Sequence, residues 1–345
     1  MQIHISWADI ASDARAILPI FLPFSGCPVR CIFCAQHLQT GAGGRSFRQA
    51  LEDLEHQLRT RAAAASPADL GFFGGTFTAL EPDHFAACLA LVRRHRKDGR
   101  IRAARCSTRP DAVDAARLAM LAEAGFEMVE LGIQSFDAGA LAATRRGYNG
   151  DIAAEACAAV RASGLRLGVQ LLPGMPGVTP EIFQKDVRAA LDCGAQALRF
   201  YPCLVINGTR LADLWRRGDF VPWSLETTIP ALAEGWLTAR HAGVPVIRMG
   251  LAQEPGLNAQ MLAGPAHPAL GAMVQGEALW RTVSDALGKH PKGVARGLRA
   301  PRNCRGFFWG HRGALRTRWS ALGLGTADVQ WHDAPEIIVE TSCES

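Results

Sequence analysis

The sequence contains no long hydrophobic run. Its most apolar stretch, residues 16–24 (AILPIFLPF), is interrupted by two prolines, whereas a helix needs about 20 apolar residues to cross a bilayer. Asp9 and Asp13 precede this stretch and disfavour a cationic leader. We therefore predict a cytoplasmic protein with no membrane partner.

An excess of one charge and a dense set of cysteines are also lacking. The 37 Lys and Arg against 32 Asp and Glu leave a net charge of +5, so any nucleic-acid contact must rest on a local patch. Ten cysteines in 345 residues are too sparse for a small disulfide scaffold and favour metal chemistry in a reducing compartment. The hydrophobic fraction of 48% excludes global disorder.

Short apolar runs alternate with longer helical patterns between residues 17 and 200, which indicates βα units on a parallel sheet. The expected strands are Ile17–Phe24, Leu70–Phe73, Ile101–Ser107, Met128–Ile133, Leu165–Leu171 and Ala197–Tyr201. Six units are too few for a closed eight-stranded barrel. We predict an α/β fold in which residues 1–205 form a partial (β/α)6 TIM-like barrel. Residues 206–345 are expected to form a smaller α/β C-terminal region that binds substrate.

Three cysteines follow the first predicted strand with the spacing C-x3-C-x2-C: Cys27, Cys31 and Cys34. Three soft thiolates in one loop can bind an iron–sulfur cube and leave one iron open for a ligand that is not protein. A zinc ion with His37 as fourth ligand is the alternative.

With this loop, the sequence resembles the radical S-adenosylmethionine (SAM) enzymes. Their CxxxCxΦC signature is present with Phe33 as the aromatic residue, and Gly74-Gly75-Thr76 after the second strand resembles their glycine motif. Taken alone, Phe33 could be a core residue and the two glycines an ordinary turn. Their positions relative to the cysteine loop favour the functional interpretation.

Later segments resemble the radical SAM core of the Elongator catalytic subunit, over about residues 17–220. They are residues 72–78, 107–111, 132–137, 170–177 and 200–218. The oxygen-independent coproporphyrinogen oxidases are more distant relatives. The Elongator subunit also has an acetyltransferase domain, which we do not expect here, and its cysteine loop is longer. The resemblance therefore carries over the SAM-cleaving core and not the acetyl transfer.

The resemblance implies a [4Fe–4S] cluster bound by Cys27, Cys31 and Cys34, with SAM on the open iron. It further implies that SAM is contacted by Phe33, Gly74, Gly75, Thr76, Ser107, Gln134, Arg146 and Gln170. Arg146 is positioned for the methionine carboxylate, with Arg145 as the alternative. The implied reaction is one-electron cleavage of SAM to methionine and a 5′-deoxyadenosyl radical, with electrons from a donor such as flavodoxin or ferredoxin. No residue is assigned to catalysis.

A basic segment, residues 289–318, is the main indication of the substrate. It contains Lys289, Lys292, Arg296, Arg299, Arg302, Arg305, Arg312, Arg316 and Arg318, and next to them Phe307, Phe308, Trp309 and Trp319. Cations interleaved with aromatic residues suit phosphate contacts and stacking on unpaired bases. We expect a transfer RNA base as substrate. The alternatives are a radical SAM enzyme acting on a small molecule or tetrapyrrole, and a carrier of a cluster or haem that does not catalyse a reaction.

For several other residues the sequence allows two interpretations. Glu130 could be an acid facing the substrate or a structural partner of an arginine, and Tyr201 could relay a proton or pack in the core. Cys203, Cys304 and Cys343 could bind a second cluster but lack the dense spacing of such domains. His267 is expected to be a structural residue of its loop.

Overall fold

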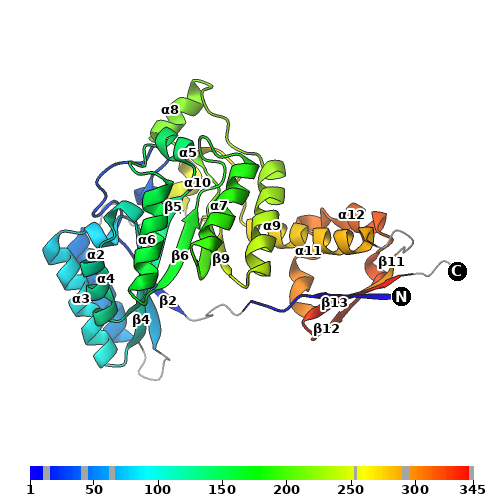
Figure 1. Cartoon of the computed structure of the whole chain (residues 1–345), viewed down its shortest axis with the longest axis horizontal. Helices are drawn as coiled ribbons and strands as arrows, with labels where there is room; N and C mark the ends of the chain where they lie inside the picture. Colours follow the sequence, from blue (N-terminus) through cyan, green and yellow to red (C-terminus); the bar gives the residue numbers. More distant parts are fainter. Residues whose placement is uncertain (11–15, 40–45, 62–66, 252–254, 290–294, 342–345) are drawn as a thin grey trace.

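A parallel sheet of seven strands curls into a half-barrel (Figure 1). The computed structural model describes residues 1–10, 16–39, 46–61, 67–251, 255–289 and 295–341. The strands, in their order across the sheet, are β2 (Ile17–Phe21), β3 (Ala68–Phe73), β4 (Ile101–Thr108), β5 (Phe126–Gln134), β6 (Arg166–Leu171), β7 (Ala197–Phe200) and β9 (Val246–Met249). This confirms the predicted partial barrel and adds β9 to it.

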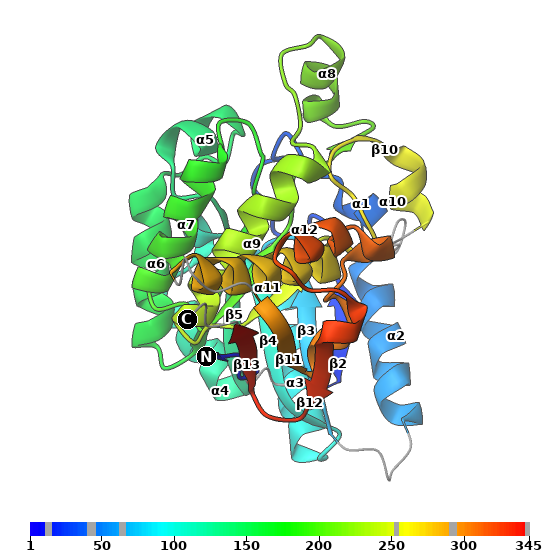
Figure 2. The same ribbon diagram turned by 90° about the vertical axis from the view of Figure 1, so that its right-hand side faces the viewer.

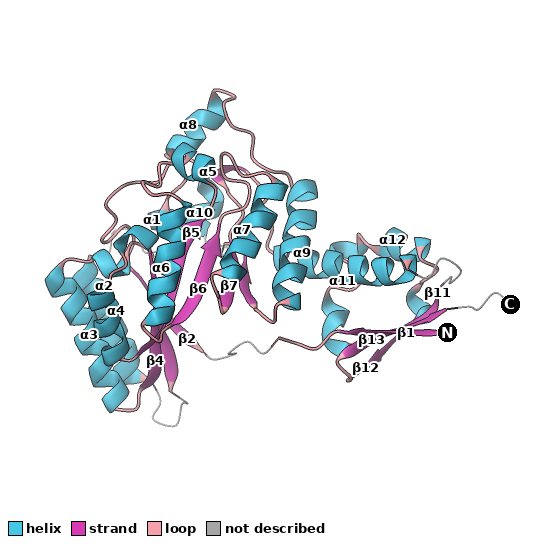
Figure 3. Cartoon of the chain, in the orientation of Figure 1, coloured by secondary structure: helices cyan, strands magenta, loops and turns pink. Residues whose placement is uncertain are grey.

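Helices cover the outer face of the half-barrel (Figure 3). They are α2 (Phe47–Thr60), α3 (Pro82–Lys97), α4 (Ala115–Ala124), α5 (Ala138–Ala143), α6 (Gly150–Ala162), α7 (Pro180–Asp192) and α9 (Leu225–His241). Local signals set several of their ends. Ser46 and Gln49 form a capping box at the start of α2, and Gly125 ends α4 with φ of 99°, a left-handed conformation that glycine adopts without strain.

A second, four-stranded sheet forms a C-terminal lobe beside the half-barrel (Figure 1), and this lobe faces the viewer in Figure 2. Its order is β1 (Gln2–Ser6), β13 (Glu336–Thr341), β11 (Ala295–Pro301) and β12 (Val329–His332), and it is accompanied by α11 (Leu270–Gly288) and α12 (Arg316–Ala321). Strand β1 pairs antiparallel with β13, so the start of the chain belongs to the lobe. The proposed division of the chain at residue 205 stays a prediction.

Short elements gather where the barrel strands end at their carboxyl termini (Figure 1). They are α1 (Gln36–Gln39), α8 (Arg210–Arg216), α10 (Pro255–Gln260) and the antiparallel pair β8 (Val205–Ile206) and β10 (Met261–Ala263). Among the described residues, no helix combines the length and the apolar character needed to span a bilayer.

The barrel strands bury both of their faces, as parallel strands usually do. Leu70, Phe72, Val129, Leu131 and Leu198 are at most 1% exposed and pack under the helices. Because successive side chains of a strand alternate between its two faces, the residues next to them point into the barrel. Many of these inward residues are polar.

Candidate active site

A cavity of about 430 Å³ lies at the carboxyl ends of the barrel strands. The inward positions of neighbouring strands meet there, because all strands of a parallel sheet end at the same edge. They include Phe21, Phe73, Ser107, Gly132, Gln134, Gln170, Arg199 and Arg248. Cys27, Cys31, Phe33 and Cys34 of the loop after β2 line the same cavity.

The cysteine loop lies directly against the segment that follows β3. Thr76 N donates a hydrogen bond to Ser25 O at 2.7 Å. A Cβ atom on Gly26 would lie only 2.4 Å from Thr76 O, so this approach requires glycine. The two segments predicted to bind the cluster and SAM are therefore in contact.

Gln36 connects the same two segments, and the sequence analysis did not find it. Its Oε1 accepts hydrogen bonds from Phe24 N at 2.7 Å and from Gly75 N at 2.8 Å. It lies two residues after Cys34, and no spacing rule distinguishes such a glutamine. Its contacts hold the cysteine loop against the glycine segment.

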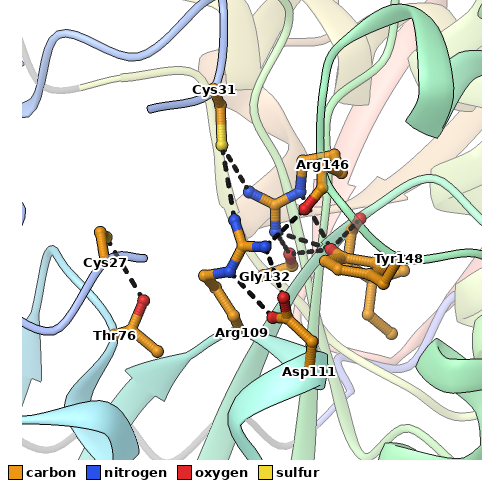
Figure 4. A network of polar contacts seen from close by, with 9 residues as sticks. Cys27, Cys31, Thr76, Arg109, Asp111, Gly132, Arg146 and Tyr148 are labelled. Atoms are coloured by element: carbon orange, nitrogen blue, oxygen red, sulfur yellow. Dashed lines mark hydrogen bonds and ion pairs between the residues drawn. The ribbon is translucent and has the colours of Figure 1, made fainter. Parts of the chain in front are cut away.

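The backbone of the glycine segment lies close to the cysteine loop, as predicted for two residues without side chains. Gly74 and Gly75 have φ of 78° and 67°, and a Cβ on Gly75 would lie 2.2 Å from Ser25 O. Both glycines line the cavity, whereas Thr76 is fully buried. Its Oγ1 lies 3.3 Å from Cys27 Sγ (Figure 4). The Thr76 side chain thus contacts a cysteine rather than the cavity.

Two buried arginines donate to the sulfur of Cys31 (Figure 4). Nη1 of Arg146 lies 3.0 Å from Sγ, and Nη1 of Arg109 lies 3.7 Å from it. Asp111 accepts from Arg109 Nε at 2.8 Å and from Nη2 at 2.6 Å. Arg109, which was not predicted as a site residue, is therefore charge-paired. Arg146 has no carboxylate partner among the described residues.

Tyr148 and a backbone carbonyl fix the orientation of Arg146 (Figure 4). Tyr148 Oη accepts from Nε at 3.0 Å and from Nη2 at 2.6 Å, and Gly132 O also accepts from Nη2. Arg145 is exposed and does not line the cavity. Of the two candidates for the SAM carboxylate, the structure brings Arg146 to the cavity.

Gln134 and Gln170 meet at the ends of β5 and β6. Nε2 of Gln170 lies 3.3 Å from Oε1 of Gln134. Between Leu131 and Gln134 the register of β5 on β6 shifts, and Gln134 has φ of 74°. A bulge of this kind re-aims a side chain, and a left-handed non-glycine residue costs of order 1 kcal/mol or more. The backbone thus holds Gln134 in a strained conformation at the cavity.

Glu130 has a structural role, which decides the question left open by the sequence. Its carboxylate accepts from Arg199 Nε and, at 3.0 Å, from Arg199 Nη2, and Arg105 Nη1 lies 3.5 Å away. Gly168 leaves room for this carboxylate side chain, because a Cβ there would lie 2.9 Å from Glu130 Cγ. Glu130 is on the same face of β5 as Gly132 but does not line the cavity, and it holds Arg199 in place.

The three cysteines are a donor set that suits an iron–sulfur cluster, because a cube offers separate irons to separate soft thiolates. Among the described residues, no three His, Cys, Asp or Glu side chains form a site for a single metal ion. The ring of His37 lies 5.7 Å from the ring of Phe24 instead. The donor set therefore fits the predicted cluster.

Two thiols of this loop, Cys27 and Cys34, have raised pKa values and are held in the protonated form in the absence of metal. Burial raises the pKa of Cys27, and burial together with the neighbouring thiols raises the pKa of Cys34 to about 12. Iron binding must therefore displace protons from the loop, because only thiolates ligate.

Salt bridges occupy part of the basic segment. Arg302 Nε lies 2.9 Å from Asp333. Arg318 pairs with Glu277, and its guanidinium carbon lies 3.6 Å from the ring centre of Trp280. These cations hold the lobe together and are less available to a ligand.

Two aromatic residues of the basic segment are not accessible to a ligand. Phe308 and Trp319 are fully buried and stack with ring centroids 4.3 Å apart, so the prediction that they stack on bases is wrong. Arg305, Arg312 and Arg316 are exposed. Lys292 lies outside the described residues.

The remaining cysteines do not form a second metal site in the described part of the chain. Cys203 lines the barrel cavity, whereas Cys304 contacts Asn303 in the C-terminal lobe. Cys343 lies outside the described residues. His267 accepts a hydrogen bond from Ala269 N at 3.0 Å, as expected of a structural loop residue.

Asp186 of α7 supports the turn that follows Gln134. Its Oδ1 accepts from Phe136 N at 2.7 Å, and Oδ2 is buried without a partner among the described residues. Burial raises the pKa of this carboxyl to about 6. Since the folded pKa exceeds the unfolded value of about 3.9, its contribution to stability is present at low pH and is lost as the pH rises through 6.

We expect Asp186→Asn to stabilise the protein at pH 8 by up to about 3 kcal/mol, the equivalent of two pKa units. At pH 4.5 the folded protein keeps this carboxyl protonated while the unfolded chain is already largely ionised, so the advantage of the variant should shrink to about 1 kcal/mol. Urea unfolding at both pH values measures the difference. A variant that is less stable than the wild type at pH 8 would contradict this account.

Sequence comparison finds two families along the chain. The family described as the radical SAM superfamily matches residues 21–190, and the radical SAM C-terminal domain matches residues 195–279. The tRNA uridine(34) acetyltransferase of Methanocaldococcus infernus is 29% identical over 258 residues, which are 63% of this chain and 48% of that protein. The heme chaperone HemW of Mycobacterium tuberculosis is 29% identical over 206 residues, 58% of this chain and 53% of HemW. The chain spans about half the length of these relatives.

Solved structures show the same fold. The archaeal Elp3 of Methanocaldococcus infernus, with an N-terminal deletion, superposes with a TM-score of 0.57 at 23% identity, over 82% of this chain and 64% of that one. Coproporphyrinogen III oxidase of Escherichia coli gives a TM-score of 0.50 at 19% identity, over 76% of this chain and 58% of that one. At these identities the similarity concerns the fold alone.

Proposed function

The chain belongs to the radical SAM superfamily, and we propose that it binds a [4Fe–4S] cluster through Cys27, Cys31 and Cys34 and cleaves SAM there. Cluster and SAM together would supply a 5′-deoxyadenosyl radical by one-electron reduction, and the protein would supply binding, orientation and exclusion of water. The observation that carries the proposal is that the cysteine loop, the glycine segment and Arg146 line one cavity.

Each predicted SAM contact has a suitable position in this cavity, apart from the buried Thr76 side chain. Arg146 offers an oriented guanidinium without a carboxylate partner among the described residues, which suits the carboxylate of SAM. Gly74 and Gly75 leave the backbone accessible to its amino group. The paired amides of Gln134 and Gln170 suit the ribose hydroxyls. Phe33 and Ser107 line the same cavity, and we assign Phe33 to the adenine and Ser107 to a further contact with SAM.

The substrate that we propose is a transfer RNA base. Support comes from the tRNA-modifying relatives and from the exposed Arg305, Arg312 and Arg316. The rings of His267 and His311, with centroids 4.7 Å apart, join the basic segment to the loop that follows β10. This loop reaches the cavity rim, since His267 borders a small pocket with Leu204 and Leu251, which also line the main cavity. We also place the enzyme in the cytoplasm, with flavodoxin or ferredoxin as electron donor.

Formation of 5′-deoxyadenosine by the anaerobically reconstituted, reduced protein tests this function. We expect bulk transfer RNA to raise the rate several-fold, and ribonuclease treatment of the RNA to abolish the increase. Turnover that RNA does not stimulate would favour a small molecule or tetrapyrrole as substrate. Binding of SAM without any cleavage would favour a carrier of a cluster or haem.

A further inference from the structure

The cavity wall carries arginines and, among the described residues, no carboxylates. The arginines that line it are Arg30, Arg109, Arg146, Arg199 and Arg248. Asp111 and Glu130, which do not line the cavity, neutralise Arg109 and Arg199. The other three have no carboxylate partner among the described residues, so the cavity has an excess of positive charge. A site lined by one sign of charge concentrates ligands of the opposite sign.

Arg248 lies at the edge of the sheet opposite to the strand that precedes the cysteine loop. It is in register with Arg199 on the neighbouring strand, so both side chains project from the same face. Glu130 neutralises Arg199, whereas Arg248 has no carboxylate partner among the described residues. An anionic ligand at Arg248 would supply the missing counter-charge.

The Arg248 side chain has hydrogen-bond donors that are available to a ligand. Its Nε donates to Gly250 O at 3.3 Å, and among the described residues its Nη1 and Nη2 donate to no acceptor. The residue is exposed at the cavity. A guanidinium with two available amino groups matches two oxygens of a phosphate.

Tyr201 provides a second donor in the cavity, two residues after Arg199, with which Arg248 is in register. It follows β7 and lines the same cavity. Its Oη accepts from Arg199 Nη1 at 3.1 Å, and within the described part of the chain its own proton has no acceptor. A hydroxyl that accepts from a cation becomes a stronger donor. The Tyr201 hydroxyl can therefore donate a hydrogen bond to an anion in the cavity.

We propose that Tyr201 and Arg248 bind a phosphate group of the substrate and so position the nucleotide that enters the cavity. This inference rests on the proposed action on RNA and adds a binding site to it. Arg146, at the cysteine side, is assigned to the carboxylate of SAM, whereas Arg248 is at the opposite edge strand. SAM and a phosphate can therefore occupy different parts of the cavity.

The test compares binding of bulk transfer RNA to the cluster-loaded wild type and to Arg248→Gln and Tyr201→Phe between 50 and 200 mM salt. One lost phosphate contact on single-stranded RNA should reduce the slope of log Kd against log salt by about 0.7. We expect this change in Arg248→Gln. Tyr201→Phe, which loses no charge, should weaken binding several-fold with an unchanged slope. Arg248→Lys should keep the slope and bind less tightly than the wild type.

Arg59→Gln is the matched control, because it removes the same charge from an exposed site. Arg59 is in the last turn of α2, at the end remote from the cavity, and its loss should leave both affinity and slope unchanged. Iron content and SAM affinity of each variant show whether it is folded and loaded.

Uridine 5′-monophosphate serves as a second probe and distinguishes the source of the phosphate. If Arg248→Gln weakens binding of this nucleotide but not of RNA, the phosphate belongs to a small molecule and the RNA assignment is overturned. If neither ligand is affected although wild-type RNA binding depends on salt, the phosphate site is overturned and the proposed function stands. If the wild type binds no RNA, the proposed RNA substrate is wrong. Binding of uridine 5′-monophosphate to the wild type and to Arg248→Gln then tests the phosphate site, and equal affinities would overturn it.

Discussion

The Cys31→Ala variant is expected to lose the [4Fe–4S] cluster after anaerobic reconstitution. Two cysteines would then remain in the loop, too few to hold a cube that already has one iron open to SAM. The loop itself should persist, because Gln36 and the contact of Ser25 with Thr76 hold it without Cys31. The measurements are bound iron per chain and the broad absorbance near ~400 nm of iron–sulfur proteins.

Cys203→Ala is the control for this experiment. Cys203 lines the same cavity and is 2% exposed, but it lies outside the loop motif, so its loss should leave iron content at the wild-type level. Full iron retention by Cys31→Ala would overturn the ligand assignment. Equal loss in both variants would indicate general damage to the cavity.

The Arg146→Ala variant is expected to bind SAM at least about tenfold more weakly, because it would lose a hydrogen bond to a charged carboxylate, worth about 1.5 to 3 kcal/mol. The donor of this bond is the Nη1 N–H that Cys31, Tyr148 and Gly132 leave available. Its iron content should match the wild type, since no cysteine changes. The barrel should also remain folded. Tyr148 Oη lies 3.0 Å from both Gly132 O and Ile133 O and keeps an acceptor after Arg146 is removed. Equilibrium binding of SAM to the cluster-loaded protein provides the measurement.

Two further variants show whether SAM affinity depends on the guanidinium group of Arg146 or only on positive charge near the site. Arg146→Lys retains the charge but not the fork and should recover only part of the affinity. Arg145→Gln removes the adjacent exposed charge and should bind SAM as the wild type does. Unchanged affinity in Arg146→Ala would exclude this residue as the carboxylate anchor.

The sequence alone was sufficient to predict the partial barrel, which the structure confirms, and to propose a site at the carboxyl ends of its strands. Apolar runs such as Leu70–Phe73 and Leu165–Leu171 alternate with helical patterns, and the structure has strands at these places. Signals of this kind involve residues a few positions apart, so they can be recognised without knowing any long-range contact. The spacing of Cys27, Cys31 and Cys34 is equally local. Because the loop directly follows a predicted strand, it was expected at the carboxyl edge of the sheet.

Tertiary structure decided which side chains meet. Arg109 and Arg146 reach Cys31 from 78 and 115 residues away. Residues 2–6 pair with the end of the chain, and Gln36 bridges segments 39 residues apart. The strained Gln134 depends on the register of β5 on β6. Local sequence cannot select such partners, because the entropic cost of closing a loop rises only slowly with its length and discriminates little between candidates. Packing and hydrogen bonding in the folded barrel make the selection.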